Sequence, residues 1–141
     1  HYGSTNEFIE NYQEFRTDKG FLVTNYPMTE MKDTMLIDMI EVEEKYRRTG
    51  EGSRILLKSL KDMSENGIKM VEAATTEQGG YLFKTFENKG ILERIWSDDL
   101  LASKQITKEI WEQMQGGIKV YRINKTKLNE QWKIFKRTIK G

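Results

Sequence analysis

The segment from residue 34 to residue 66 decides the fold, and it reads TMLIDMIEVEEKYRRTGEGSRILLKSLKDMSEN. Its first nine residues, 34–42, are largely apolar, which predicts a strand. Two glycines then interrupt the pattern, and leucine and methionine recur at helical spacing as far as Gly67. We therefore expect a helix over about 52–66 that ends at a left-handed glycine.

The loop between this strand and this helix has the composition of an anion-binding site. Its glycines let the backbone turn tightly and approach a ligand, and free N–H groups at the helix N-terminus point toward an anion. Two arginines add charge-assisted hydrogen bonds. The alternative interpretation is an ordinary glycine turn that starts a core helix. The loop residues are Arg47, Arg48, Thr49, Gly50, Glu51, Gly52 and Ser53.

The rest of the chain shows strand and helix patterns in turn. A capping box at Ser4 and Glu7 predicts a helix over about 5–16, and the strand 21–26 forms an antiparallel hairpin with 34–42. Further strands are expected over 68–75, 91–96 and 118–124, and further helices between Gly80 and Gly90, from Ser103 to Gly116, and over about 126–139. This order predicts one mixed α/β domain, 1–141, with a core over 20–96 and C-terminal additions over 97–141.

The composition excludes several kinds of chemistry. The chain has no cysteine, and its only histidine is His1, so disulfides, thiolate catalysis and cysteine-ligated zinc are excluded. We expect no metal site, and proton transfer has to use carboxylates, tyrosines, lysines or water. No apolar run approaches the roughly 18 residues of a transmembrane helix. The resulting expectation is a cytoplasmic protein without membrane contact.

The glycine loop matches the pattern R/Q-x-x-G-x-G/A at Arg47, Gly50 and Gly52, and in this it resembles the GNAT (Gcn5-related) N-acetyltransferase superfamily. Residues 52–57 are similar to the start of the family's cofactor helix, and 81–91 resemble its later F-Y-E-K-x-G-F segment. The resemblance covers about 34–96 closely and 20–33 loosely. It implies acetyl-CoA as cofactor. It also implies a mixed, mostly antiparallel sheet flanked by helices, here with an extra C-terminal basic helix.

The resemblance further implies a reaction and a set of contacts. The reaction is direct transfer of an acetyl group to a primary amine, a protein lysine or N-terminus first among them, in a ternary complex. In the family two strands splay apart in a V, and the pantetheine arm lies in the gap. Carried onto this chain, backbone contacts to the acyl arm fall at Ile40 and Val42, and pyrophosphate contacts fall at Arg47 to Ser53. The stretch 36–42 is also similar to small phage-type acetyltransferases, including an anti-CRISPR enzyme.

The chain departs from the family pattern at three places. Glu51 puts an acid inside the phosphate loop, and we expect its side chain to point outward to solvent. Phe86 stands where many members carry the tyrosine that protonates the departing thiolate, and Tyr81 is the candidate substitute, with a packed or surface tyrosine as the alternative. The N-terminal region is short, since one predicted helix precedes the first strand. The acceptor site is therefore expected to be unusually open or to be built from the C-terminal additions.

The candidate bases are carboxylates on two neighbouring strands. Asp38 and Glu41 differ by three positions, so they face opposite sides of a regular strand unless a bulge intervenes. Asp38 lies within an apolar stretch, where a paired structural carboxylate is the favoured interpretation. Glu41 ranks first as the base and Glu72 second, and for both the alternative is a solvated or ion-paired edge.

The C-terminal segment is strongly basic. Residues 119–141 carry eight Lys or Arg residues and one Glu, whereas 1–118 carry more acidic than basic residues. The basic side chains of 125–140 flank an apolar stripe, which predicts a docked helix with a solvated outer face. That face is also a candidate contact for nucleic acid or for an acidic protein acceptor. The chain is thus predicted to be an N-acetyltransferase, with a catalytically lost interaction module and a nucleic-acid-directed protein as alternatives.

Overall fold

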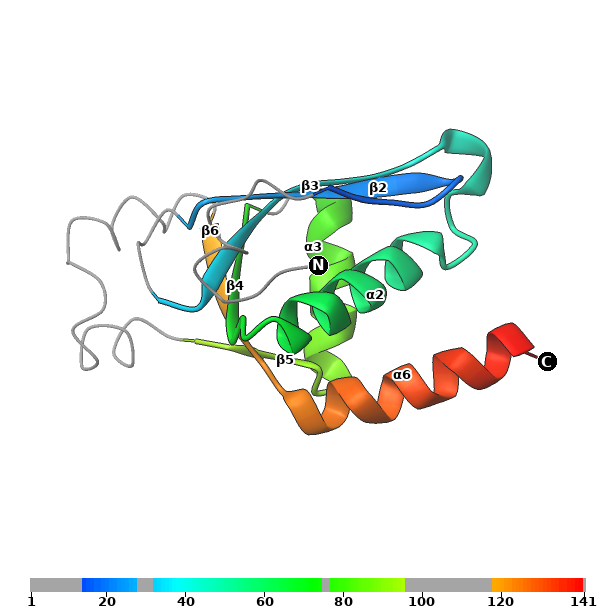
Figure 1. The fold of residues 1–141 in the computed structure, drawn as a ribbon. Helices are drawn as coiled ribbons and strands as arrows, with labels where there is room; N and C mark the ends of the chain where they lie inside the picture. The colour runs from blue at the N-terminus through cyan, green and yellow to red at the C-terminus, as the bar shows by residue number, and fades with distance from the viewer. Residues whose placement is uncertain (1–13, 28–31, 75–76, 96–117, 141) are drawn as a thin grey trace.

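The computed structural model describes residues 14–27, 32–74, 77–95 and 118–140 (Figure 1). Its strands are β1 (Glu14–Arg16), β2 (Gly20–Asn25), β3 (Thr34–Val42), β4 (Met70–Ala74), β5 (Leu92–Arg94) and β6 (Ile118–Ile123). Its helices are the short 3-10 helix η1 (Glu44–Tyr46), α2 (Glu51–Glu65), α3 (Glu77–Asn88) and α6 (Lys125–Lys140). None of these helices is long and apolar enough to cross a membrane.

Six strands form one sheet in the order β1-β2-β3-β4-β6-β5. Strands β3 and β4 are parallel, and the other four neighbouring pairs are antiparallel. The predicted mixed and mostly antiparallel sheet is therefore confirmed, as are the hairpin of β2 with β3 and the helix that follows the glycine loop. Strand β6 lies between β4 and β5, so the last strand of the sequence is an inner strand of the sheet.

The predicted helix over 5–16 is wrong at its C-terminal end. Residues Glu14–Arg16 form β1 and pair with β2, with Phe15 packed against the core and its two charged neighbours exposed. This alternation satisfies the sheet period, and pairing with β2 outweighs the local helical pattern. Residues 5–13, and the helix predicted from Ser103 to Gly116, lie outside the described residues.

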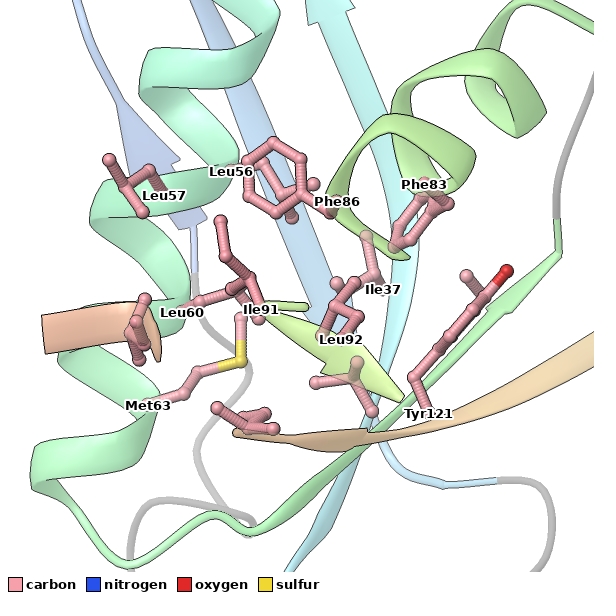
Figure 2. Close-up of a cluster of buried hydrophobic side chains, with 14 of the residues drawn as sticks. Ile37, Leu56, Leu57, Leu60, Met63, Phe83, Phe86, Ile91, Leu92 and Tyr121 are labelled. Carbon is pink, nitrogen blue, oxygen red and sulfur yellow. The ribbon is translucent and has the colours of Figure 1, made fainter. Parts of the chain in front are cut away.

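The core lies between one face of the sheet and the helices α2, α3 and α6. Met35, Val71 and Tyr121 are cross-strand neighbours on that face, and they belong to the same buried cluster as the apolar stripe of α2. Figure 2 shows Phe83 and Phe86 of α3 in this cluster, together with Leu56 of α2. Burying side chains of this size contributes most of the stability of the fold.

Helix α6 packs on α2, so the predicted docking of the C-terminal helix is confirmed (Figure 1). Leu128 is fully buried, and Trp132 and Phe135 are partly buried and stack with their ring centroids 5.3 Å apart. Lys61 Nζ of α2 donates a hydrogen bond to Asn129 Oδ1 at 2.8 Å. The exposed basic residues are Lys125, Lys127, Lys133, Lys136 and Arg137.

Strand β3 contains a bulge at Asp38. Val23 of β2 pairs with Met39, but the next residue of β2 pairs with Ile37, so Asp38 has no partner in the β2 register. Before the bulge, Ile37 faces the helices, and after it Ile40 and Val42 do so. One extra residue thus changes which positions of β3 face the core.

We expect Gly20→Ala to lower the free energy of unfolding by about 1–3 kcal/mol, because the new methyl group overpacks a strand pair. A Cβ at Gly20 would lie 2.3 Å from the Glu41 carbonyl oxygen, which is backbone and cannot turn aside. The measurement is the urea unfolding midpoint.

The matched control is Gly52→Ala, whose Cβ would meet only the side chains of Leu82 at 3.7 Å and Val42 at 3.9 Å. Because Gly52 lies in the first turn of α2, its replacement by alanine should leave stability unchanged or raise it by up to about 1 kcal/mol. Equal losses in both variants would contradict the packing described for Gly20.

Candidate functional site

Strands β3 and β4 pair over only part of their length. The parallel ladder joins Thr34 through Ile37 to Met70 through Ala73 and stops there, at the bulge. Strand β3 continues to Val42 and remains paired with β2. Within the described part of the chain, residues 38–42 therefore have no strand on their β4 side. On that side the Val42 carbonyl accepts a hydrogen bond from Arg47 Nε, and the other backbone groups have no strand partner and can pair with a ligand that adds to the open edge.

The open stretch of β3 has two different faces. Ile40 and Val42 pack against the core under α2 and α3. Met39 and Glu41 alternate with them and are exposed on the opposite face of the sheet. A linear molecule lying along this edge therefore meets the apolar side chains of Ile40 and Val42 on one side and the solvent-facing side chains of Met39 and Glu41 on the other.

The glycine loop follows directly and has a conformation that opens the helix N-terminus. After η1, Arg48 and Gly50 both adopt left-handed backbone angles, with φ of 65° and 86°. Gly50 is the N-cap of α2, and its carbonyl accepts the first helical hydrogen bond, from Arg54 N at 3.1 Å. The amides of residues 51–53 precede that bond, so none of them has an acceptor inside the helix.

Space and charge around this N-terminus suit an anion. A Cβ built at Gly50 has no neighbouring atom within 4 Å, so the space next to Gly50 is open. Residues 47–50 are exposed, and two of them are arginines. Arg47 Nε donates to the Val42 carbonyl at 3.1 Å, and the Thr49 hydroxyl donates to the Tyr46 carbonyl. These two bonds connect the loop to the end of β3.

Helix α3 completes the surroundings of the loop. The Leu82 side chain of α3 and the Val42 side chain of β3 both approach Gly52 in the first turn of α2. The end of β3, the start of α2 and the N-terminal half of α3 therefore meet at one place. The sequence predicted the first two of these as neighbours, and Leu82 is an addition that the structure supplies.

The expectation that Glu51 points outward to solvent is wrong. Its side chain is only 6% exposed, and each carboxylate oxygen has a partner. Thr17 Oγ1 lies 3.3 Å from Oε1, and Arg54 Nη1 lies 3.3 Å from Oε2. An anion in the first turn of a helix is favoured by the helix dipole, and here it is held inward by a hydroxyl and a guanidinium.

The candidate bases do not lie where a regular strand would place them. Asp38 is the bulge residue and is exposed, so its interpretation as a buried structural carboxylate is wrong. Glu41 is exposed, whereas Glu72 is fully buried, so a solvated edge is wrong for Glu72. Glu72 pairs with Leu36 and Val120, whose face of the sheet is the one turned away from the helices. Glu41 faces the same side.

The aromatic candidates differ sharply in position. Phe86 is 2% exposed and belongs to the core, whereas Tyr81, one turn and a half earlier on α3, is 78% exposed. Tyr81 is thus a surface tyrosine at the half of α3 that reaches the loop. Its phenol is accessible to solvent and to a ligand.

A buried tyrosine on β6, Tyr121, was not among the predicted site residues. Tyr121 stacks on Phe83 with ring centroids 5.5 Å apart, and the Arg94 guanidinium lies 5.7 Å from its ring centroid. Burial raises the pKa of the Tyr121 phenol, and the Glu87 carboxylate raises it further. The cluster is part of the core, away from the open edge of β3.

We expect Tyr121→Phe to be less stable than the wild type by about 1 kcal/mol at pH 8, for the loss of phenol hydrogen bonds. The pKa of the Tyr121 phenol is higher in the folded than in the unfolded protein. The contribution of the neutral phenol to the free energy of unfolding is therefore complete below about pH 10, and it is lost as the pH rises through the raised folded-state pKa. Urea unfolding between pH 8 and pH 11 should show the difference between the two proteins narrowing. A constant difference across that range would count against a buried neutral phenol.

Comparison with known proteins identifies the fold. No family model matches the sequence, and no curated protein matches it. Among solved structures, N-acetylglutamate synthase from Neisseria gonorrhoeae, in complex with coenzyme A and L-arginine, superposes with a TM-score of 0.52 at 16% identity. It covers 76% of this chain, which spans 22% of that protein. Tetrahymena Gcn5 gives a TM-score of 0.51 at 12% identity, over 80% of this chain and 68% of its own.

The fold is therefore that of the GNAT acetyltransferases. The chain spans 58% of the length of another such structure, a GNAT-family acetyltransferase from Staphylococcus aureus, with 12% identity and a TM-score of 0.48. In this chain the parting of β3 from β4 and the loop before α2 are adjacent.

Proposed function

We propose that the chain binds acetyl-CoA, with the diphosphate at the amides of residues 50–53 and the acyl arm along residues 38–42 of β3. The observation that carries this proposal is the continuity of the two features. An unpaired strand edge leads, through η1 and the exposed loop residues 47–50, to a helix N-terminus with free amides and open space before it. A long ligand with an anionic middle and an amide-containing arm matches both.

The residues present fit such a ligand. Arg47 and Arg48 are exposed beside the loop and supply positive charge. Ile40 and Val42 give the arm an apolar side, and their backbone groups give it hydrogen-bonding partners. Bound acetyl-CoA supplies an activated acetyl group as a thioester. The chain holds no cysteine, so the acetyl group passes directly to the acceptor.

The acceptor is proposed to be a primary amine, with a protein lysine or N-terminus first among the candidates. The amine nitrogen forms a bond to the acetyl carbon, the carbon–sulfur bond breaks, and the amine loses a proton. An amine attacks only when neutral, so a base must take that proton. The exposed carboxylates of Asp38 and Glu41 beside the open edge also favour a cationic acceptor before it loses its proton.

Glu41 is the favoured base. It lies on the open stretch of β3, whereas Glu72 pairs with Leu36, within the continuous part of the sheet. Both side chains face the same side, so Glu72 is the alternative. Tyr81 is the candidate acid for the departing thiolate, since Phe86 is buried and has no proton to give.

A catalytically lost interaction module is the second candidate function. The burial of Phe86 in the core favours it, because the resemblance expects the family's acid at this position and Phe86 has no proton to donate. The contact of the exposed basic face of α6 with nucleic acid, or with an acidic protein acceptor, stays a prediction. The similarity to phage-type enzymes and the cytoplasmic location also stay predictions.

Calorimetry with acetyl-CoA tests the binding site. The wild type should bind, and the double variant Arg47→Ala with Gly50→Glu should lose at least about 100-fold in affinity, because it removes a cation and puts an acid in the open space. The control is Lys58→Ala, an exposed lysine of α2 outside the loop. Unchanged affinity in the double variant would remove the loop from the site.

Mass spectrometry of lysate proteins after incubation with labelled acetyl-CoA identifies the acceptor. Once it is known, Glu41→Gln should lower kcat about 100-fold or more, as expected for loss of a general base. The matched control is Glu43→Gln, an exposed acid two residues further on. A lower kcat in Glu72→Gln, together with a normal kcat in Glu41→Gln, would identify Glu72 as the general base. Cofactor binding without turnover on any amine would favour the interaction module.

A further inference from the structure

The turn between β1 and β2, residues 17–19, contacts the segment around the glycine loop at three points. The Glu43 amide donates to the Lys19 carbonyl at 2.9 Å. Lys19 Nζ lies 5.3 Å from the centroid of the Tyr46 ring. The Thr17 hydroxyl lies 3.3 Å from Glu51 Oε1. Of these contacts, the one between Thr17 and Glu51 reaches the first residue of α2.

The Thr17 hydroxyl has one proton and two nearby acceptors. The Gly20 carbonyl oxygen lies 3.4 Å away, slightly farther than Glu51 Oε1, and a carboxylate is the stronger acceptor. The same oxygen of Thr17 accepts a hydrogen bond from the Lys19 amide at 3.2 Å. The hydroxyl is therefore oriented by its own turn and directed at Glu51.

The charge of Glu51 is already offset. Arg54, one turn along α2, lies 3.3 Å from the second carboxylate oxygen. This pair has no net charge, so the repulsion between Glu51 and an anion at the same helix N-terminus is reduced. Glu51 itself is buried, with the half-buried Thr17 on one carboxylate oxygen and the exposed Arg54 on the other, whereas the space before Gly50 is open.

We propose that Glu51 is a positioning residue that ties the glycine loop to the β1–β2 turn through Thr17, and so presets the loop for an anion. This inference rests on the proposed function. Between η1 and α2 the loop is exposed and includes two left-handed residues. Ordering such residues at the moment of binding would cost conformational entropy, and a tie that orders them beforehand removes that cost.

Three variants separate the tie from the charge. Thr17→Val removes the hydroxyl, keeps the shape of the side chain at position 17 and leaves the charge of Glu51 unchanged. Glu51→Gln keeps an acceptor oxygen for Thr17 and removes the charge. Glu51→Ala removes both. Thr17→Ser is the conservative control, because it retains the hydroxyl.

Calorimetry with acetyl-CoA should show Thr17→Val and Glu51→Ala binding at least about tenfold more weakly, the effect of one hydrogen bond to a charged group. Glu51→Gln and Thr17→Ser should bind within about threefold of the wild type. Without ligand, hydrogen exchange at the amides of residues 47–53 should be faster in Thr17→Val than in Thr17→Ser, a change that a general loss of stability would spread over the whole sheet.

Two results would overturn the inference while leaving the proposed function in place. In the first, the wild type binds and Thr17→Val binds equally well, with unchanged exchange in the loop. In the second, Glu51→Ala binds more tightly than the wild type, which would make Glu51 a repulsive charge and no tie. Failure of the wild type to bind acetyl-CoA would instead remove the proposed function, and the inference with it.

Discussion

Strand β3 pairs with β4 from Thr34 to Ile37 and with β2 from Leu36 to Val42, so its second half has a strand neighbour on one side only, within the residues that the structure describes. The change occurs at Asp38, where an extra residue enters the strand. Backbone N–H and C=O groups need partners, so an open edge next to a helix N-terminus is a place where a ligand stabilises the protein. The proposed cofactor site, the placement of Glu41 and the position of the glycine loop all depend on this parting of β3 from β4.

The same bulge determines which acids share a face. In a regular strand Asp38 and Glu41 would face opposite sides, and Glu41 would turn toward the helices if Ile37 did. The added residue keeps Ile40 and Val42 on the core side and leaves Glu41 on the side that Glu72 also faces. Two carboxylates from neighbouring strands thus come to one side of the sheet, and Glu41 is the exposed one.

Much of this architecture could be predicted from local patterns, because residues 34–66 carry a strand, a glycine loop and an amphipathic helix whose period is set by packing. The elements that the patterns missed depend on contacts between distant residues. Glu14–Arg16 became a strand because β2 offers an edge, and Asp38 became a bulge because of its register with β2. Glu51 turned inward because Thr17, 34 positions earlier in the chain, lies beside it. No local spacing carries that information.

The most direct measurement is backbone amide NMR during titration with acetyl-CoA. The account predicts that the largest shift changes fall on two groups of amides, those of residues 38–42 in β3 and those of residues 50–53 at the start of α2. It also predicts small changes in β5 and on the outer face of α6. Saturable binding with its shift changes elsewhere in the sheet, and none at the open edge of β3, would contradict it.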